Sequence, residues 1–114
     1  MLVESMISIA FKNSFEQYNV KRISLFNIVN VDKYFAAINC KKINNRDVEI
    51  RVKCPVCNEY HIYNYNINDF IKRTMVIGGC EKTGLPIFFI GKTEKVEEQV
   101  NKYKEIREKL YAMI

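Results

Sequence analysis

Apolar and polar residues alternate with a period of two over several stretches of this chain, the spacing of a strand with one buried face. The clearest stretch is 48–53, where two valines and an isoleucine alternate with Glu, Arg and Lys. The same period continues over 60–67 and places His61, Tyr63 and Tyr65 on one face. Each of these two stretches is therefore predicted to be a strand.

Turn signals divide the other apolar segments into further strands. Residues 44–47 (NNRD) favour a left-handed turn, so 34–43 and 48–53 should pair as a hairpin that runs directly into Cys54. The remaining expected strands are rich in β-branched and aromatic residues and comprise 20–31, 73–77 and 86–90, with 2–11 open between a strand and a short helix.

The apolar period becomes helical towards the C-terminus. Over 94–113 the apolar residues recur every three or four positions, which is typical of a helix with one apolar face, and Thr93 can cap it. A single helical turn is expected at 66–72, capped by Asn68 or Asp69. The pattern predicts an α+β fold made mainly of antiparallel β-sheet, with one C-terminal helix.

Length and composition favour one domain. The chain has 114 residues, of which 48% are hydrophobic, and no Gly/Ser/Pro-rich linker divides it. We divide it into a β-rich part (1–47), a cysteine-bearing part (48–91) and the helical part (92–114). No apolar run reaches the length of a membrane span, and the first residues lack the basic start of a signal peptide. We therefore expect a cytoplasmic protein with reduced thiols and no membrane partner.

The cysteine spacing indicates a metal site. Cys54-Pro55-Val56-Cys57 follows a predicted strand, and Cys80 follows two glycines further along the chain. Two cysteines separated by two residues can reach one ion from a single tight bend, and the proline fixes one backbone angle in that bend. Three thiols and a fourth donor make the tetrahedral set that zinc prefers.

These residues resemble the zinc-ribbon family over about 48–91. In that family a first Cys-Pro-x-Cys knuckle at a hairpin tip is followed by a second Cys-x-x-Cys knuckle, and the resemblance implies a structural Zn²⁺. Cys54 and Cys57 match the first knuckle and Cys80 begins the second, but Thr83 stands where the last cysteine would be. His61, the one histidine of the chain, is our expected fourth ligand. Other residues remain open as that ligand, namely Cys40 as a weaker choice, Glu59 and Glu81.

Two other interpretations of the cysteines stay open. The chain could be a degenerate ribbon that has lost its metal, or Cys54 and Cys57 could be a redox pair. The second interpretation has support, because Cys-Pro-x-Cys after a strand resembles glutaredoxin-like sites. It is opposed by the strand-like alternation after Cys57, since a reactive thiolate of that class sits at a helix N-terminus.

Positive charge is concentrated before the cysteines. The net charge is +5, and residues 1–53 hold nine Lys and Arg against five Asp and Glu. Such an excess attracts phosphates, although it also fits an ordinary solvated sheet face. If the neighbouring strands share one surface, the chain would carry a cationic, aromatic site for single-stranded nucleic acid. Its expected residues are Lys41, Lys42, Arg46, Arg51, Lys53, Tyr63 and Tyr65.

The sequence therefore predicts a non-enzymatic zinc-ribbon-like binding module, regulatory in role, that contacts nucleic acid or a protein partner. No Ser-His-Asp set, Gly-rich phosphate loop or paired-carboxylate motif is present, so catalysis is not expected. The alternatives are a structural or interaction protein that forms a homodimer through its C-terminal helix, and a CxxC thiol oxidoreductase.

Overall fold

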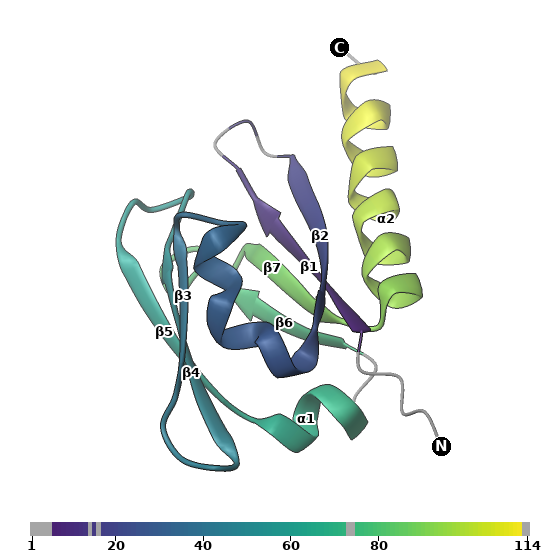
Figure 1. The fold of residues 1–114 in the computed structure, drawn as a ribbon. Coiled ribbons are helices and arrows are strands. Elements are labelled where there is room, and N and C mark those ends of the chain that lie inside the picture. The colour runs from purple at the N-terminus through teal and green to yellow at the C-terminus, as the bar shows by residue number, and fades with distance from the viewer. Residues whose placement is uncertain (1–5, 14, 16, 73–74, 113–114) are drawn as a thin grey trace.

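Two antiparallel sheets and a long helix are stacked as three layers in the computed structural model of the protein, which describes residues 6–13, 15, 17–72 and 75–112 (Figure 1). The four-stranded sheet has the order β2-β1-β7-β6, and the three-stranded sheet has the order β3-β4-β5. The strands of the first sheet are β1 (Met6–Lys12), β2 (Tyr18–Ser24), β6 (Met75–Gly79) and β7 (Pro86–Gly91). Those of the second are β3 (Ile38–Lys42), β4 (Asp47–Lys53) and β5 (Tyr60–Asn66). This arrangement confirms the α+β class.

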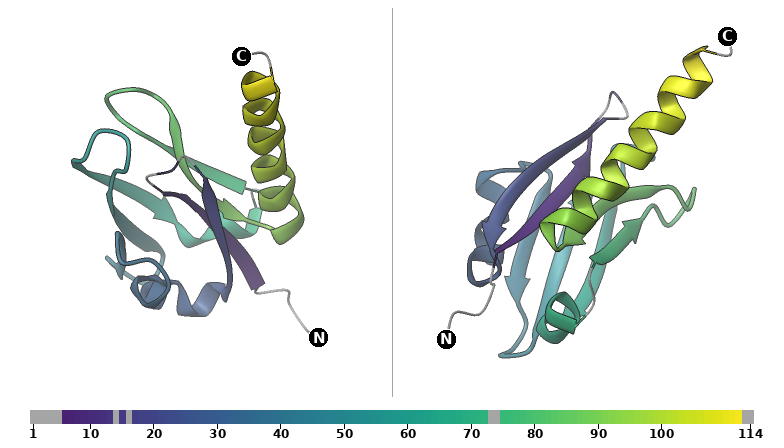
Figure 2. Two further views of the ribbon diagram at one scale, coloured as in Figure 1. Left: turned by 90° about the horizontal axis from the view of Figure 1, so that it is seen from above. Right: turned by 90° about the vertical axis from the view of Figure 1, so that its right-hand side faces the viewer.

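Helix α2 (Thr93–Ala112) covers the face of the four-stranded sheet that is turned away from the other sheet (Figure 2). Its Val96 is fully buried against Ala10 of β1 and Phe89 of β7, as its predicted apolar stripe requires. Val100 and Tyr103 of the same stripe pack on this cluster, whereas Ile106 is exposed. Among the described residues, no helix combines the length and the apolar character needed to cross a membrane.

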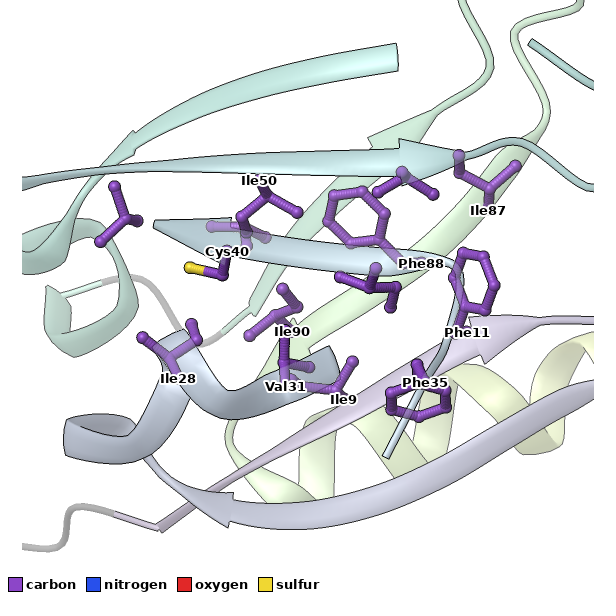
Figure 3. Close-up of a cluster of buried hydrophobic side chains, with 14 of the residues drawn as sticks. Ile9, Phe11, Ile28, Val31, Phe35, Cys40, Ile50, Ile87, Phe88 and Ile90 are labelled. Carbon is purple, nitrogen blue, oxygen red and sulfur yellow. The ribbon is translucent and has the colours of Figure 1, made fainter. Parts of the chain in front are cut away.

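The main core lies between the two sheets (Figure 3). Ile9 and Phe11 of β1 and Phe88 and Ile90 of β7 meet Ile50 of β4 there, and all five are buried. Strand β7 is therefore buried on both faces, because Phe89, between Phe88 and Ile90, points to α2 instead. A strand enclosed in this way reads as a continuous apolar run in the sequence, as 87–90 does.

The segment 20–31 is not one strand, which corrects the sequence prediction. Strand β2 ends at Ser24, and the chain continues as the 3-10 element η1 (Leu25–Lys33). The element is kinked at Asn30, which joins two short helical turns, and Ile28 before the kink and Val31 after it are both buried in the main core. Burial of this pair outweighs the strand preference of the β-branched residues. The following strand, β3, consequently begins at Ile38 and not at residue 34.

Asparagine side chains shape two of the turns. Asn44 accepts hydrogen bonds from the backbone amides of Arg46 and Asp47 at 2.8 and 2.9 Å, so the predicted turn at 44–47 is held by its own side chain. The short helix α1 (Ile67–Lys72) is capped by Asn66, whose side chain accepts from the amide of Asn68 at 2.8 Å. The expected cap at Asn68 or Asp69 is thus placed two to three residues too late.

Gly78 makes room for a core aromatic ring, and replacing it by alanine is expected to destabilise the fold. A Cβ atom at Gly78 would lie 2.0 Å from Cε2 of Phe88, a buried ring that also meets Tyr63 edge-on. Overpacking of this kind costs about 1–3 kcal/mol of unfolding free energy. Denaturant unfolding of Gly78→Ala measures the cost, with Gly79→Ala as the control, because a Cβ there meets its nearest atom at 3.6 Å. Equal stability of the two variants would contradict this packing.

Candidate metal centre

Two hairpin turns of similar construction face each other at one end of the sheets. The first joins β4 to β5 and carries Cys54 and Cys57; the second joins β6 to β7 and begins at Cys80. In the first, the amide of Asn58 donates to the carbonyl of Cys54 at 3.0 Å, and in the second the amide of Gly84 donates to that of Cys80 at 2.7 Å. Each turn thus closes with the same bond between residues four apart.

The residue four positions after the first cysteine of each turn has left-handed backbone angles. Asn58 has a φ of 63° and Gly84 a φ of 74°, a region that asparagine and glycine tolerate best. By this correspondence Thr83 occupies, in the second turn, the position that Cys57 occupies in the first. The two turns therefore correspond position by position, and the second turn has Thr83 where the first has the thiol of Cys57.

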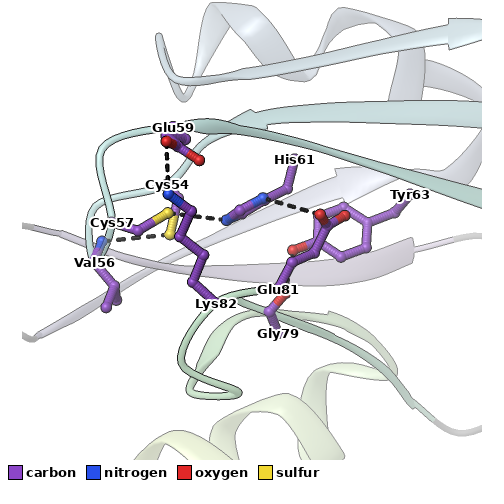
Figure 4. Close-up of polar contacts among 9 residues, drawn as sticks. All are labelled: Cys54, Val56, Cys57, Glu59, His61, Tyr63, Gly79, Glu81 and Lys82. Atoms are coloured by element: carbon purple, nitrogen blue, oxygen red, sulfur yellow. Dashed lines mark hydrogen bonds and ion pairs between the residues drawn. The ribbon is translucent and has the colours of Figure 1, made fainter.

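Four potential ligand atoms converge between the turns. The Sγ atoms of Cys54, Cys57 and Cys80 and a ring nitrogen of His61 all lie within 4.8 Å of one another. Cys57 Sγ lies 3.2 Å from His61 Nε2 (Figure 4). A tetrahedral zinc ion with bonds of about 2.0–2.3 Å holds its ligand atoms about 3.3–3.8 Å apart. The four side chains are thus within metal-binding distance, and their spacing is compatible with a zinc site.

His61 reaches the cysteines because β5 turns its odd-numbered residues inward. It lies opposite Val52 of β4, and its side chain is only 2% exposed. The other ring nitrogen, Nδ1, lies 3.7 Å from a carboxylate oxygen of Glu81 (Figure 4). A carboxylate at Nδ1 favours a proton on that nitrogen and leaves Nε2 as the electron-pair donor. The ring is therefore oriented so that Nε2 points to the sulfurs.

The surroundings of the thiols act on them unequally. A hydrogen bond from the Thr83 side chain lowers the pKa of Cys80 to about 6, against the opposing effect of burial, with further lowering from the amides of Thr83 and Lys82 and from His61. Burial raises the pKa of Cys57, against a lowering hydrogen bond from the Glu59 backbone. Because the thiolate is the metal-binding form, Thr83 supports Cys80 as a ligand without being one itself.

An ion pair connects the rims of the two turns. Lys82 Nζ lies 2.7 Å from a carboxylate oxygen of Glu59. The hydrogen bond from Lys82 lowers the pKa of Glu59. The same bond raises the pKa of Lys82, and the negative charges of the nearby Cys57 and Cys80 thiolates raise it further. Both side chains are about half exposed, so the pair adds little stability, but it places one positive charge beside the thiols.

Cys40 lies apart from this cluster. It faces Ile50 in the strand register, and it is buried in the main core. Burial raises the pKa of its thiol to about 11, so it behaves as a small apolar side chain. Glu59 and Glu81 stand beside the four ligand atoms and pair with Lys82 and His61, respectively.

The structure does not group the predicted nucleic-acid residues as the sequence suggested. Tyr63 and Tyr65 lie opposite Ile50 and Val48, on the inner face of the three-stranded sheet, and the Tyr63 hydroxyl donates to the carbonyl of Gly79. They therefore pack between the sheets and cannot stack with bases on the outer face. The basic residues are partly or fully solvent-exposed, namely Lys41, Lys42, Arg46, Arg51 and Lys53. Nucleic-acid binding itself stays a prediction.

Tyr60 is the aromatic residue that the sequence reasoning missed on that outer face. It pairs with Lys53 in the strand register and is 58% exposed. The alternation along β5 could have identified it. Tyr60 is even-numbered and lies on the outer face, whereas the tyrosines selected from the sequence are odd-numbered and lie on the inner face. Glu81 was also undervalued, although it directly follows the ligand candidate Cys80.

Comparisons with protein-family models, with curated proteins and with solved structures found no match to this chain. The site is therefore interpreted from its own geometry.

Proposed function

We propose that Cys54, Cys57, His61 and Cys80 bind one structural Zn²⁺ ion, and that the chain is a non-enzymatic, zinc-stabilised binding module. The observation that carries this proposal is the convergence of the four ligand atoms within 4.8 Å. Three of these residues come from the three-stranded sheet side and Cys80 from the four-stranded sheet side, so the ion would join the two sheets.

The donor set favours zinc over other common metals. Three thiolates and one imidazole are soft to borderline ligands, which suit Zn²⁺ and are unsuited to Mg²⁺ or Ca²⁺. Four protein ligands also complete a tetrahedral shell and leave no position for water or substrate. A closed shell of this kind is typical of structural zinc, which supports a role in stability and not in hydrolysis.

The surroundings of Cys57 argue against the redox alternative. The low-pKa thiol of a CxxC oxidoreductase is the first cysteine, activated at a helix N-terminus, but here Cys54 leads into a turn and then into β5. Burial also raises the pKa of Cys57. The thiol of Cys80 and the imidazole of His61 lie beside the two cysteines. A metal site requires such additional ligands, whereas a two-cysteine redox pair does not.

Metal analysis of the purified protein tests the proposal. We expect about one zinc per chain after exhaustive dialysis, because a closed site of three thiolates and an imidazole releases the ion slowly. A strong chelator should remove this zinc and lower the melting temperature, and re-added Zn²⁺ should restore both. Purified protein that contains no zinc, and whose melting is unaffected by chelator and by added zinc, would refute the site.

A further inference from the structure

The outer face of the three-stranded sheet carries a cationic cluster close to the first cysteine turn. Tyr60 of β5 lies opposite Lys53 of β4, and two basic side chains of β4 contact its ring, with Arg51 Cζ 4.7 Å and Lys53 Nζ 4.8 Å from the ring centroid. Cation–π attraction of this kind holds a positive group against an aromatic ring. The ring therefore keeps two long, otherwise mobile cations together on an open surface.

A carboxylate near these cations is engaged by another residue, since Glu59, which lies within electrostatic reach of Lys53, pairs with Lys82 at 2.7 Å. Among the ion pairs of the described residues, none includes Arg51 or Lys53. The acidic residues of the same strand are engaged elsewhere, since Glu49 pairs with Lys41 at 3.4 Å and Asp47 accepts hydrogen bonds from Asn44 and Asn66. The end of the sheet next to the cysteines thus keeps a net positive charge that is available to an anion.

Two hollows adjoin this cluster and share part of their walls. The larger, about 260 Å³ in volume, is lined by Ala36, Ala37, Asn39, Arg51, Lys53 and Tyr60. The smaller, about 200 Å³, lies beside it and is lined by Asn39, Cys40, Lys41, Glu49 and Arg51. Asn39 and Arg51 border both hollows, and we call the two hollows together the outer groove. It runs across β3 and β4 and is open to solvent.

We propose that the outer groove binds single-stranded nucleic acid, with Arg51 and Lys53 on the phosphates and the Tyr60 ring against a base. This rests on the proposed function as a binding module and names its partner. Unpaired cations beside an exposed aromatic ring are what a sequence-tolerant single-strand site combines. The exposed Ile62, which lies opposite Arg51, extends the apolar surface beside the ring.

The charges favour this occupant over an uncharged protein surface. A protein partner without acidic groups would remove Arg51 and Lys53 from water and leave them unpaired, which is costly. An isolated small phosphate compound is also a poorer fit, because ligands of that size are usually enclosed over most of their surface. A phosphodiester chain can instead follow an elongated, open groove and place successive phosphates near the cations.

Fluorescence anisotropy with labelled 12-nucleotide poly(U) and poly(dT) tests the proposal on the zinc-loaded protein. We expect binding at about 20 mM salt that weakens steeply as salt rises, because each neutralised phosphate releases counterions. The double change Arg51→Gln and Lys53→Gln should weaken binding by at least tenfold. It should also make the slope of log affinity against log salt shallower by about 1.4, that is, roughly 0.7 for each lost phosphate contact on a single strand.

Tyr60→Ala separates stacking from charge. Loss of one base–aromatic stack should weaken binding by about fivefold or more and leave the salt slope nearly unchanged. Two matched controls lie away from the groove: Lys102→Gln with Lys104→Gln on α2 removes the same charge, and Phe15→Ala removes an exposed ring from the β1–β2 loop. Both controls should bind as the unchanged protein does, and all variants should keep its melting temperature.

Several outcomes would overturn the inference. Absence of binding by zinc-loaded, folded protein at low salt would reject the nucleic-acid partner while leaving the zinc site intact. Equal weakening by the groove variant and the helix control would show only general charge attraction, and amide shifts on oligonucleotide addition that avoid β4 and β5 would place binding elsewhere. Conversely, protein that contains no zinc as purified, whose melting does not respond to chelator or added zinc, and that still binds through Arg51, Lys53 and Tyr60 would refute the metal site and retain the groove.

Discussion

Replacing Cys54 by serine is expected to abolish stoichiometric zinc binding and to lower the free energy of unfolding by about 4 kcal/mol or more, a loss typical of removed metal sites. Cys54 is fully buried, and its sulfur accepts a hydrogen bond from the amide of Val56 at 3.4 Å. A neutral hydroxyl cannot replace this thiolate as a zinc ligand. Isolated zinc-finger peptides gain roughly 10–16 kcal/mol from the ion. The effect here should be smaller, because the two sheets also share an apolar core.

Cys40→Ala is the matched control for this experiment. It also removes a buried thiol, but the side chain lies in the apolar core and outside the group of four ligand atoms. We expect it to cost about 1 kcal/mol as a small cavity and to retain one zinc per chain. Chemical unfolding with parallel metal analysis checks both variants. A Cys54→Ser protein that holds as much zinc as the Cys40→Ala protein would show that the ligands have been assigned incorrectly.

Replacing His61 by alanine should weaken zinc binding by more than about 100-fold. Loss of a residue that only hydrogen-bonds to a ligand costs up to about 100-fold, and loss of a direct ligand should cost more. The second cysteine turn offers a rescue, because Thr83 corresponds in position to Cys57 and its side chain hydrogen-bonds to Cys80. Adding Thr83→Cys to His61→Ala should therefore recover most of the lost affinity through a set of four thiolates. Competition with a chromophoric chelator measures the three affinities.

Cobalt substitution identifies the donors in each variant, since tetrahedral sites of three and four thiolates differ in their absorption. Glu81→Gln is the milder companion, because it removes the carboxylate beside His61 Nδ1 and leaves all four donors in place. It should weaken binding by about tenfold. Unchanged zinc affinity in His61→Ala, or a spectrum of four sulfurs in the unchanged protein, would remove His61 from the site.

The alternation of apolar and polar residues predicted the strands correctly where one face of a strand is buried. The period over 48–53 and 60–67 located β4 and β5 and put His61 on the inner face, because the side chains of a strand alternate strictly. The cysteine spacing likewise located both turns. Since the bend needed by a pair of ligands is itself local, the positions of Cys54 and Cys57 could be interpreted without the rest of the fold.

Features that depend on partners distant in the sequence could not be predicted. Residues 25–31 have the composition of a strand, and only the contacts available beside β3 favour the kinked helical turns that bury Ile28 and Val31. The proximity of His61 to Cys80 likewise requires that β5 and the β6–β7 turn meet across two sheets. Tyr60 was missed for a simpler reason: Tyr63 and Tyr65 were selected as an aromatic face, although the alternation places them on the same face as His61, which is the inner one.

The placement of the ligands at hairpin tips has a kinetic consequence. Cys57 is only partly buried, and Thr83 and Gly84 at the other tip are exposed, while the core strands behind them are enclosed. Separation of the two tips would therefore release the ion without dissolving the core, through a local opening that is much more frequent than complete unfolding. The residence time of the metal would then be governed by how often the tips part, and the lifetime of the folded chain would be a separate and longer quantity.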